Sequence, residues 1–161
     1  MSQSILISGG TLANGKKSDL LIKDGLIAEI AEKIEEKDAK RIDASHSIVL
    51  PGLVDLHTHL REPGREDAET VESGSRAGVK GGFTALSAMA NTSPVADTAG
   101  VVEQVYRLGQ SAGLLDVFPI GAVTRGLEGE HLAEIGAMAD SMARVRVFSD
   151  DGHCVFDPLV M

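Results

Sequence analysis

From Pro51 onward the sequence alternates between short apolar runs and amphipathic segments, and this alternation is the strongest constraint on the fold. Apolar runs of strand length occur at residues 48–57, 83–89, 116–120 and 144–148. Helix-like segments lie between them, at about residues 67–80, 98–112 and 132–142. Strands that alternate with helices form parallel sheets with right-handed crossovers. We therefore expect an α/β fold with four parallel strands, the first of which is buried.

The first 50 residues have a different pattern, with short apolar runs and turn signals but no helix-like segment. Asp24-Gly25 separates the runs 19–23 and 26–30, and Asp-Gly between two apolar runs is a strong hairpin signal. We expect a small β-unit here, and this region contains no cluster of catalytic residue types.

Composition and charge exclude several classes of function. The formal net charge is −9, whereas a nucleic-acid-binding surface needs a basic patch. Cys154 is the only cysteine, so a disulfide framework is excluded and a reducing, cytoplasmic location is the simpler expectation. Apolar runs are all shorter than the roughly 20 residues that cross a bilayer, so we expect no membrane partner.

Polar side chains gather where the expected strands end. His57 and His59 follow the first strand, and residues two apart in an extended chain point to the same face. Two imidazoles on one face suit a metal ion, and the guanidinium of Arg61 suits an anionic substrate. Asn91 follows the second strand. Asp150 and Asp151 follow the fourth, so three segments are expected to converge on one rim of the sheet.

Three motifs in this set carry a resemblance to a known family. Residues 51–59, Pro-Gly-Leu-Val-Asp-Leu-His-Thr-His, resemble the first barrel strand of the amidohydrolase superfamily. The continuation at 60–64, Leu-Arg-Glu-Pro-Gly, is similar to dihydroorotase of the long, bacterial-type class, as are the segments 89–94 and 148–152. The resemblance implies a partial (β/α)8 TIM barrel with about the first four strands at 51–161. It also implies a small β-sandwich segment at 1–50.

The same resemblance implies a zinc-dependent cyclic amidase that interconverts dihydroorotate and N-carbamoyl-L-aspartate in pyrimidine biosynthesis. His57 and His59 would be metal ligands. Asp151 would bridge to a second zinc ion, and Asp150 is the rival for that position because sequence cannot fix a one-residue register.

The implied substrate-binding residues are His59, Arg61 and Asn91. Asp55 would orient one of the histidines or be a satisfied buried carboxylate. The resemblance places the general-base aspartate outside this chain, so no catalytic residue is assigned within residues 1–161.

A complete barrel needs about 250 residues, so the chain is expected to be the N-terminal portion of such an enzyme. Alone it should have little or no turnover and should tend to associate through unpaired edge strands. A hydantoinase or allantoinase-like amidase is the alternative within enzymes. A non-catalytic homologue that scaffolds aspartate transcarbamoylase is the alternative outside them. A homo-oligomer is a further expectation for its partners.

Overall fold

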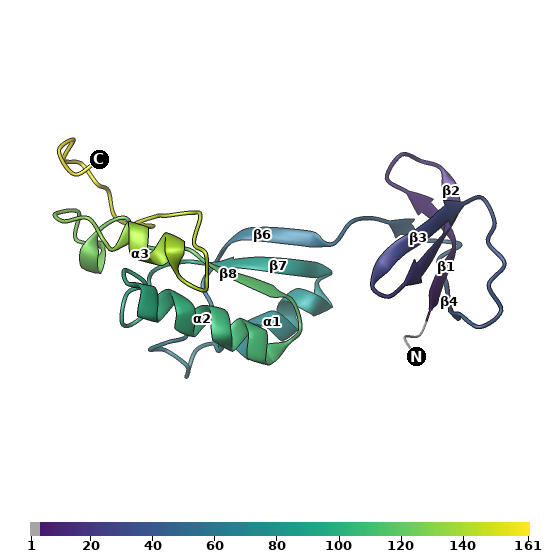
Figure 1. Ribbon diagram of the computed structural model, residues 1–161, viewed down its shortest axis with the longest axis horizontal. Helices are drawn as coiled ribbons and strands as arrows, with labels where there is room; N and C mark the ends of the chain where they lie inside the picture. The colour runs from purple at the N-terminus through teal and green to yellow at the C-terminus, as the bar shows by residue number, and fades with distance from the viewer. Residues whose placement is uncertain (1–3) are drawn as a thin grey trace. The chain divides into compact units, whose positions relative to one another are not determined.

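The computed structural model describes residues 4–161, and the chain divides into two compact units between Pro51 and Gly52. Each unit has its own sheet, and together they hold the eight strands and three α-helices drawn in Figure 1. The units are described separately below. Among residues 4–161, no helix combines the length and the apolar character needed to span a membrane.

The first unit is a five-stranded sheet. Its strands are β1 (Ile5–Leu12), β2 (Lys17–Lys23), β3 (Leu26–Ala31), β4 (Lys40–Asp43) and β5 (Ile48–Val49). The order is β3-β2-β1-β4, with β5 also pairing with β1. The β2–β3 hairpin turns at Asp24-Gly25, where both residues have positive φ. Leu6, Leu21 and Ile34 form its small core.

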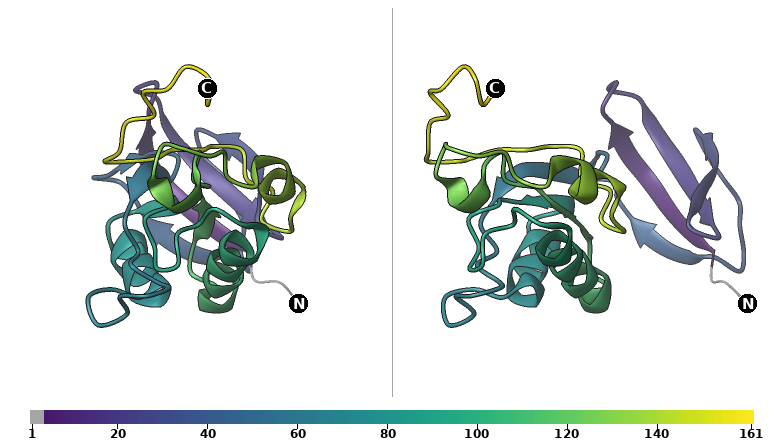
Figure 2. Two further views of the ribbon diagram at one scale, coloured as in Figure 1. Left: turned by 90° about the vertical axis from the view of Figure 1, so that its left-hand side faces the viewer. Right: turned by 60° about the vertical axis from the view of Figure 1, so that its left-hand side comes forward.

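The second unit contains the alternating elements that the sequence predicts. In chain order they are β6 (Leu53–Thr58), α1 (Val71–Lys80), β7 (Phe83–Ala88), α2 (Ala99–Ala112), β8 (Asp116–Pro119), the 3-10 turn η1 (Arg125–Leu127) and α3 (Ile135–Asp140). Strands β6, β7 and β8 pair in that order, all parallel. Helices α1 and α2 pack against each other and cover the same face of the sheet (Figures 1 and 2).

Local capping explains where the two longer helices begin and end. Helix α1 begins after Thr70 and not at the expected Asp67, because Thr70 and Ser73 form a reciprocal capping box. Helix α2 begins after Thr98 and ends at Gly113, which takes the left-handed conformation. Val71, Leu86, Val105 and Val117 belong to the buried cluster between the helices and the sheet.

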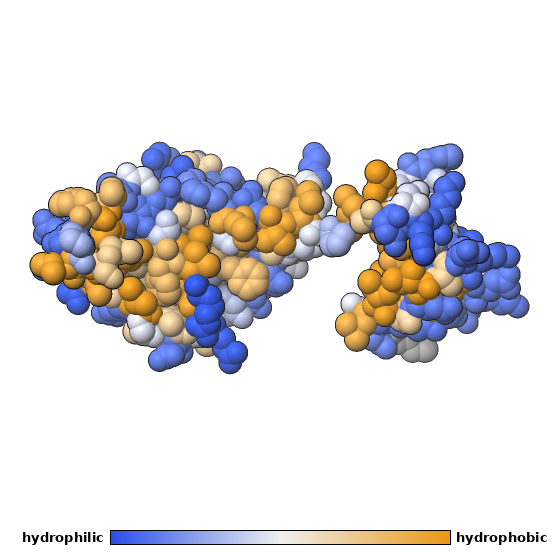
Figure 3. All heavy atoms as spheres, turned by 90° about the horizontal axis from the view of Figure 1, so that it is seen from above, coloured by the Kyte–Doolittle hydropathy of each residue, from blue (hydrophilic) through white to orange (hydrophobic). Residues whose placement is uncertain are grey.

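The expectation that the first strand of the second unit is buried was wrong. Strand β6 lies at the edge of its sheet and has only β7 as a neighbour. Its side chains at Val54 and Leu56 are therefore 56% and 73% exposed. Figure 3 views the molecule from the side of β6 and shows hydrophobic side chains gathered over it. Strand β3 of the first unit likewise exposes Leu26, Ile27 and Ile30.

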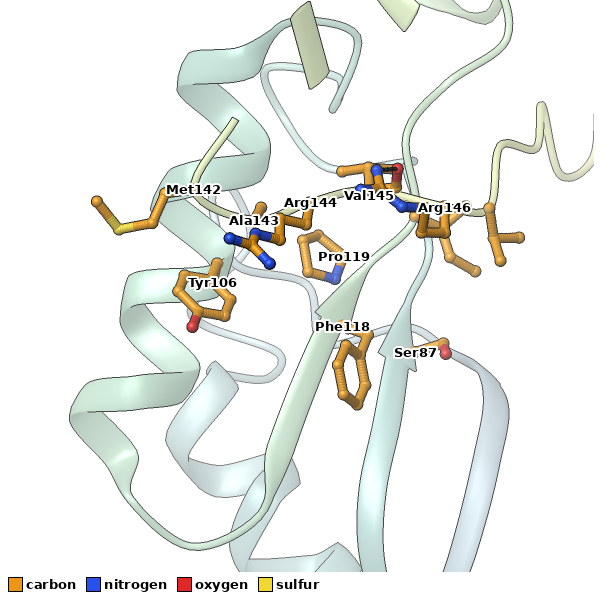
Figure 4. A pocket seen from close by; sticks show the side chains of 11 residues that line it. Ser87, Tyr106, Phe118, Pro119, Met142, Ala143, Arg144, Val145 and Arg146 are labelled. Carbon is orange, nitrogen blue, oxygen red and sulfur yellow. Dashed lines mark hydrogen bonds between the residues drawn. The ribbon is translucent and has the colours of Figure 1, made fainter. Parts of the chain in front are cut away.

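The expected fourth strand at 144–148 is absent as a strand among the described residues. Only Phe148 makes a parallel bridge, to Gly121. Arg144 has a φ of 47°, which an extended strand does not permit, and the Arg146 guanidinium donates to Ala139 O and Val145 O. A largely apolar cavity of about 360 Å³ consequently separates residues 142–147 from the edge of β8 (Figure 4).

The third helix is shorter than expected. Leu132 pairs with Thr124 in an antiparallel bridge, and the neighbouring backbone bonds to residues 123 and 125 prevent the helix from starting there. Ser141 is extended, so Met142 also lies outside the helix. Met138 remains fully buried and belongs to a second core, which includes Val102 and Val145.

Candidate metal centre

The side chains of His57, His59 and Asp151 meet in one cluster. The two histidines come from the beginning of the second unit's sequence, and the aspartate comes from near its end. The Nε2 atoms of His57 and His59 lie 3.3 Å apart. The Oδ2 atom of Asp151 lies 3.3 Å from His57 Nε2 and 3.5 Å from His59 Nε2. Across residues 4–161, this is the only group of three His, Cys, Asp or Glu side chains whose ligand atoms lie this close together.

The dimensions of this triangle suit a zinc ion. Tetrahedral zinc binds nitrogen and oxygen at about 2.0–2.1 Å, which places its ligand atoms about 3.3–3.4 Å apart. The three measured separations, 3.3, 3.3 and 3.5 Å, are close to that value. Two imidazoles and one carboxylate are also a donor set that zinc accepts in catalytic sites. His57, His59 and Asp151 could therefore form one face of a metal coordination sphere.

The position of His57 and His59 at the end of strand β6 places their side chains on the same side of the chain. Thr58, which lies between them, points the other way, and its hydroxyl donates to Ser87 O of β7 at 2.8 Å. The backbone N–H of Met89 donates to Thr58 O at 2.9 Å. These bonds fix the carboxyl end of β6 against β7, and strand alternation then directs His57 and His59 to the same side.

Asn91 contacts one of the two histidines on the side away from the cluster. Its carbonyl oxygen Oδ1 lies 2.9 Å from His59 Nδ1, and an amide oxygen accepts a hydrogen bond from a ring N–H. In the neutral tautomer with its proton on Nδ1, the lone pair of Nε2 is free, and Nε2 is the atom in the cluster. A hydrogen bond of this kind commonly orients a metal-binding histidine.

The two neighbouring aspartates have different surroundings. Asp151 is half-buried and turns its carboxylate toward the histidines. Asp150 is buried and turns its carboxylate toward the segment after β8. There it accepts hydrogen bonds from Val123 N and Thr124 N, at 2.7 and 3.1 Å, and from the Thr124 hydroxyl. Asp151 is thus the one of the pair whose carboxylate faces the cluster.

The structure does not bring all the sequence-predicted residues into contact. Arg61 lies in the loop after His59 with a φ of 61°, and in the described part of the chain its guanidinium has no hydrogen-bond or ion-pair partner. Asp55 contacts the backbone N–H of His57 at 3.0 Å and not an imidazole. It therefore supports the local irregularity of β6 between Asp55 and Thr58, and it affects the ring of His57 only through the backbone.

Sequence reasoning missed two residues that support this region. Glu62 Oε2 accepts from Val71 N at 2.7 Å and ties the Arg61 loop to the start of α1. Thr124 is fully buried and binds the Asp150 carboxylate. No local pattern marked Thr124, which lies five residues after the end of β8 and 26 residues before its partner Asp150.

Comparisons with known proteins give a consistent picture. Residues 46–157 match the dihydro-orotase-like family. A dihydroorotase of Leifsonia xyli subsp. xyli is 62% identical over 159 residues, which cover 99% of this chain and 36% of that protein. A dihydroorotase of Streptomyces coelicolor is 57% identical over 97% of this chain and 36% of that protein. The chain thus spans about a third of the length of these relatives.

Solved structures are similar in fold. The structure titled L-hydantoinase (dihydropyrimidinase) from Arthrobacter aurescens superimposes with a TM-score of 0.67 and 25% identity. The match covers 79% of this chain and 29% of that chain. The architecture of residues 4–161 is mixed α/β, and the fold of these structural neighbours is a TIM barrel.

Proposed function

Because the chain belongs to the dihydroorotase-like family, we propose that its second unit forms the zinc-binding part of a cyclic amidase. The proposed reaction is the interconversion of dihydroorotate and N-carbamoyl-L-aspartate in pyrimidine biosynthesis. The observation that carries the proposal is the triangle of His57, His59 and Asp151 ligand atoms, with separations that suit tetrahedral zinc. The metal is needed for the chemistry because an amide carbonyl and water react slowly without a Lewis acid.

The proposed fold is the beginning of a (β/α)8 barrel at residues 51–161, preceded by a small β-sandwich segment at 1–50. The parallel β6-β7-β8 sheet, covered by helices on one face, supports this assignment. Exposed Leu56 at the sheet edge and Phe118 on β8 also fit a barrel whose further strands would cover them.

Each residue of the cluster has a defined part in the proposed site. Bound zinc would supply Lewis-acid chemistry, polarising the amide carbonyl and activating water. His57 and His59 would hold it through their Nε2 atoms, and the Asp151 carboxylate would add a negative charge. Asp151 Oδ2 faces both histidines, and we propose that this carboxylate bridges to a second zinc ion. The family resemblance implies that the remaining ligands and the general-base aspartate lie outside residues 1–161.

Two polar groups suit the carboxylate of the substrate, one in the loop after His59 and one in contact with His59. The Arg61 guanidinium is a planar fork that matches a carboxylate, and it has no partner among the described residues. Asn91 uses its oxygen on His59, which leaves its amide nitrogen with two donors for substrate. We further propose a cytoplasmic location, for which the single cysteine is the support. The proposed partner is either a second copy of the chain or aspartate transcarbamoylase.

A hybrid enzyme tests the proposal. Residues 1–161 would replace the matching 159-residue region of the Leifsonia xyli dihydroorotase, which is 62% identical. We expect the hybrid to bind zinc and to hydrolyse dihydroorotate in preference to dihydrouracil, hydantoin and allantoin. His59→Ala in the hybrid should remove both zinc and turnover. Preference for hydantoin or dihydrouracil would favour the hydantoinase alternative, and a folded, zinc-loaded but inactive hybrid would contradict the amidase assignment.

A further inference from the structure

We infer that Asp150 is a positioning residue that fixes the carboxylate of Asp151 against His57 and His59. The inference rests on the proposed metal site and adds a residue that does not itself contact the cluster. Its basis is the set of hydrogen bonds by which Asp150 joins the segment before Asp151 to the segment after β8.

The Asp150 carboxylate is a buried anchor. The residue is only 6% exposed, and both of its oxygens are occupied. Oδ1 accepts from Val123 N at 2.7 Å and from Thr124 N at 3.1 Å, while Oδ2 accepts from the Thr124 hydroxyl. Hydrogen bonds to an ionised acceptor are stronger than neutral ones, and a buried carboxylate that loses its donors is heavily penalised. This contact therefore holds residue 150 in one place.

Thr124 is itself held from the other side. It is fully buried, and its hydroxyl oxygen accepts from Gly129 N at 2.9 Å while the hydroxyl donates to Asp150. The chain on either side of Asp150 is also tied down. Ser149 N donates to Gly121 O at 2.9 Å, and His153 N donates to Asp150 O at 2.7 Å. The turn that carries Asp151 is thus fixed through its neighbours.

The position of Asp151 depends on these hydrogen bonds of its neighbours because its own side chain is held by few contacts. Its side chain is 30% exposed, and its carboxylate contacts the two histidines, whose ring nitrogens would themselves be taken up by a metal. A shift of about 1 Å would take the 3.3–3.5 Å separations out of the range that zinc accepts. Partners that orient metal ligands typically contribute 10–100-fold to metal affinity.

Zinc titration of the 161-residue chain tests the inference, with the dissociation constant measured by competition against a chromophoric chelator. Asp150→Ala should weaken zinc binding 10–100-fold. Asp150→Asn keeps an oxygen for the two backbone donors and should recover most of the affinity. Thr124→Val, which removes only the hydroxyl, should fall between them, and Thr124→Ser should bind as the wild type does.

A matched control separates positioning from general stabilisation. Asp19 is also buried and accepts two backbone N–H bonds, from Gly9 and Ile34, but it lies in the first unit. Asp19→Ala should lower the thermal midpoint while zinc affinity stays within twofold of the wild type. The visible spectrum of the cobalt-substituted chain gives a second readout. Asp150→Ala should change the intensity of its d–d bands, whereas Asp19→Ala should leave them as in the wild type.

Each outcome bears on one claim. Wild-type zinc affinity in a folded Asp150→Ala chain would overturn the inference. If Asp150→Ala does not fold, wild-type affinity in both Asp150→Asn and Thr124→Val would overturn it equally. A wild-type chain that binds no zinc, or whose binding survives Asp151→Ala, would instead refute the metal site and the proposed function with it.

Discussion

The packing of α2 on β8 gives a prediction whose magnitude follows directly from the structure. Helix α2 passes β8 at Gly109, where an added Cβ would lie 2.5 Å from Val117 Cβ and 2.8 Å from Val117 Cγ2. Carbon atoms in contact are normally about 3.5–4.0 Å apart. The backbone fixes the Val117 Cβ, so no rotamer of that side chain relieves the overlap. In Gly109→Ala, helix and strand must separate by about 1 Å.

Gly100 in the same helix is the matched control, because an added Cβ there meets nothing within 4 Å. Both substitutions gain up to about 0.5–1 kcal/mol from helix propensity, with less expected at Gly100 in the first turn. Only Gly109→Ala carries an overpacking cost, of about 1–3 kcal/mol. Gly100→Ala should therefore be neutral or slightly stabilising. The free energy of unfolding of Gly109→Ala should therefore be lower than that of Gly100→Ala by about 0.5–3 kcal/mol, which is the overpacking cost less the extra helix-propensity gain at Gly109.

Urea unfolding followed by tyrosine fluorescence measures this difference in the second unit alone. Tyr106 is the only tyrosine, tryptophan is absent, and Tyr106 lies on α2. Adding Val117→Ala to Gly109→Ala should give no rescue, since the clashing Cβ remains. A Gly109→Ala chain as stable as Gly100→Ala would refute the reasoning, because it would mean that helix and strand are free to separate.

Three further predictions concern capping, charge and association. Thr70→Ala removes the capping box of α1 and should lower the free energy of unfolding by about 1 kcal/mol in the tyrosine assay, while Thr70→Ser should not. Backbone donors on Ile34 and Gly9 hold the pKa of Asp19 below its ordinary value. The ionised Asp19 therefore contributes its full stabilisation of the folded state above the unfolded pKa, about 3.9, and this contribution is lost as the pH falls through the lower folded pKa. The thermal midpoints of the wild type and of Asp19→Asn should consequently converge at acid pH. Exposed Leu56 on the edge of β6 should promote association, which sedimentation velocity should show to be reduced in Leu56→Lys.

The order of elements in the second unit could be predicted because its signals are local. Apolar runs and amphipathic segments alternate, and caps such as Thr98 and Gly113 mark the ends of α2 within a few residues of sequence. The fourth strand could not be predicted in the same way. Residues 144–148 have a strand-like pattern, but Arg144 takes a left-handed conformation and Arg146 bonds to the backbone near α3. Neither the left-handed residue nor the bond from Arg146 to Ala139 O follows from a strand-like alternation of apolar residues.

The candidate site also has a part that local sequence predicts and a part that it does not. The shared face of His57 and His59 follows from the period of a strand, so the sequence predicts it. The choice between Asp150 and Asp151 depends on where donors of a distant segment lie, and Thr124 gave no signal that it would be one of them. The exposure of β6 was missed because its apolar pattern is that of a buried strand. Burial depends on how many strands and helices pack against a strand, and its own sequence does not give that number.

The cluster of His57, His59 and Asp151 also has a consequence for how the second unit folds. Because 94 positions of sequence separate His57 from Asp151, bringing them together carries a loop-closure entropy of about 4 kcal/mol. A metal ion gains all three ligands only after β7, α2 and β8 have formed between them. Metal binding would therefore act late in folding and would slow unfolding of the second unit, while the first unit, which contributes no ligand, would unfold at the same rate with or without metal.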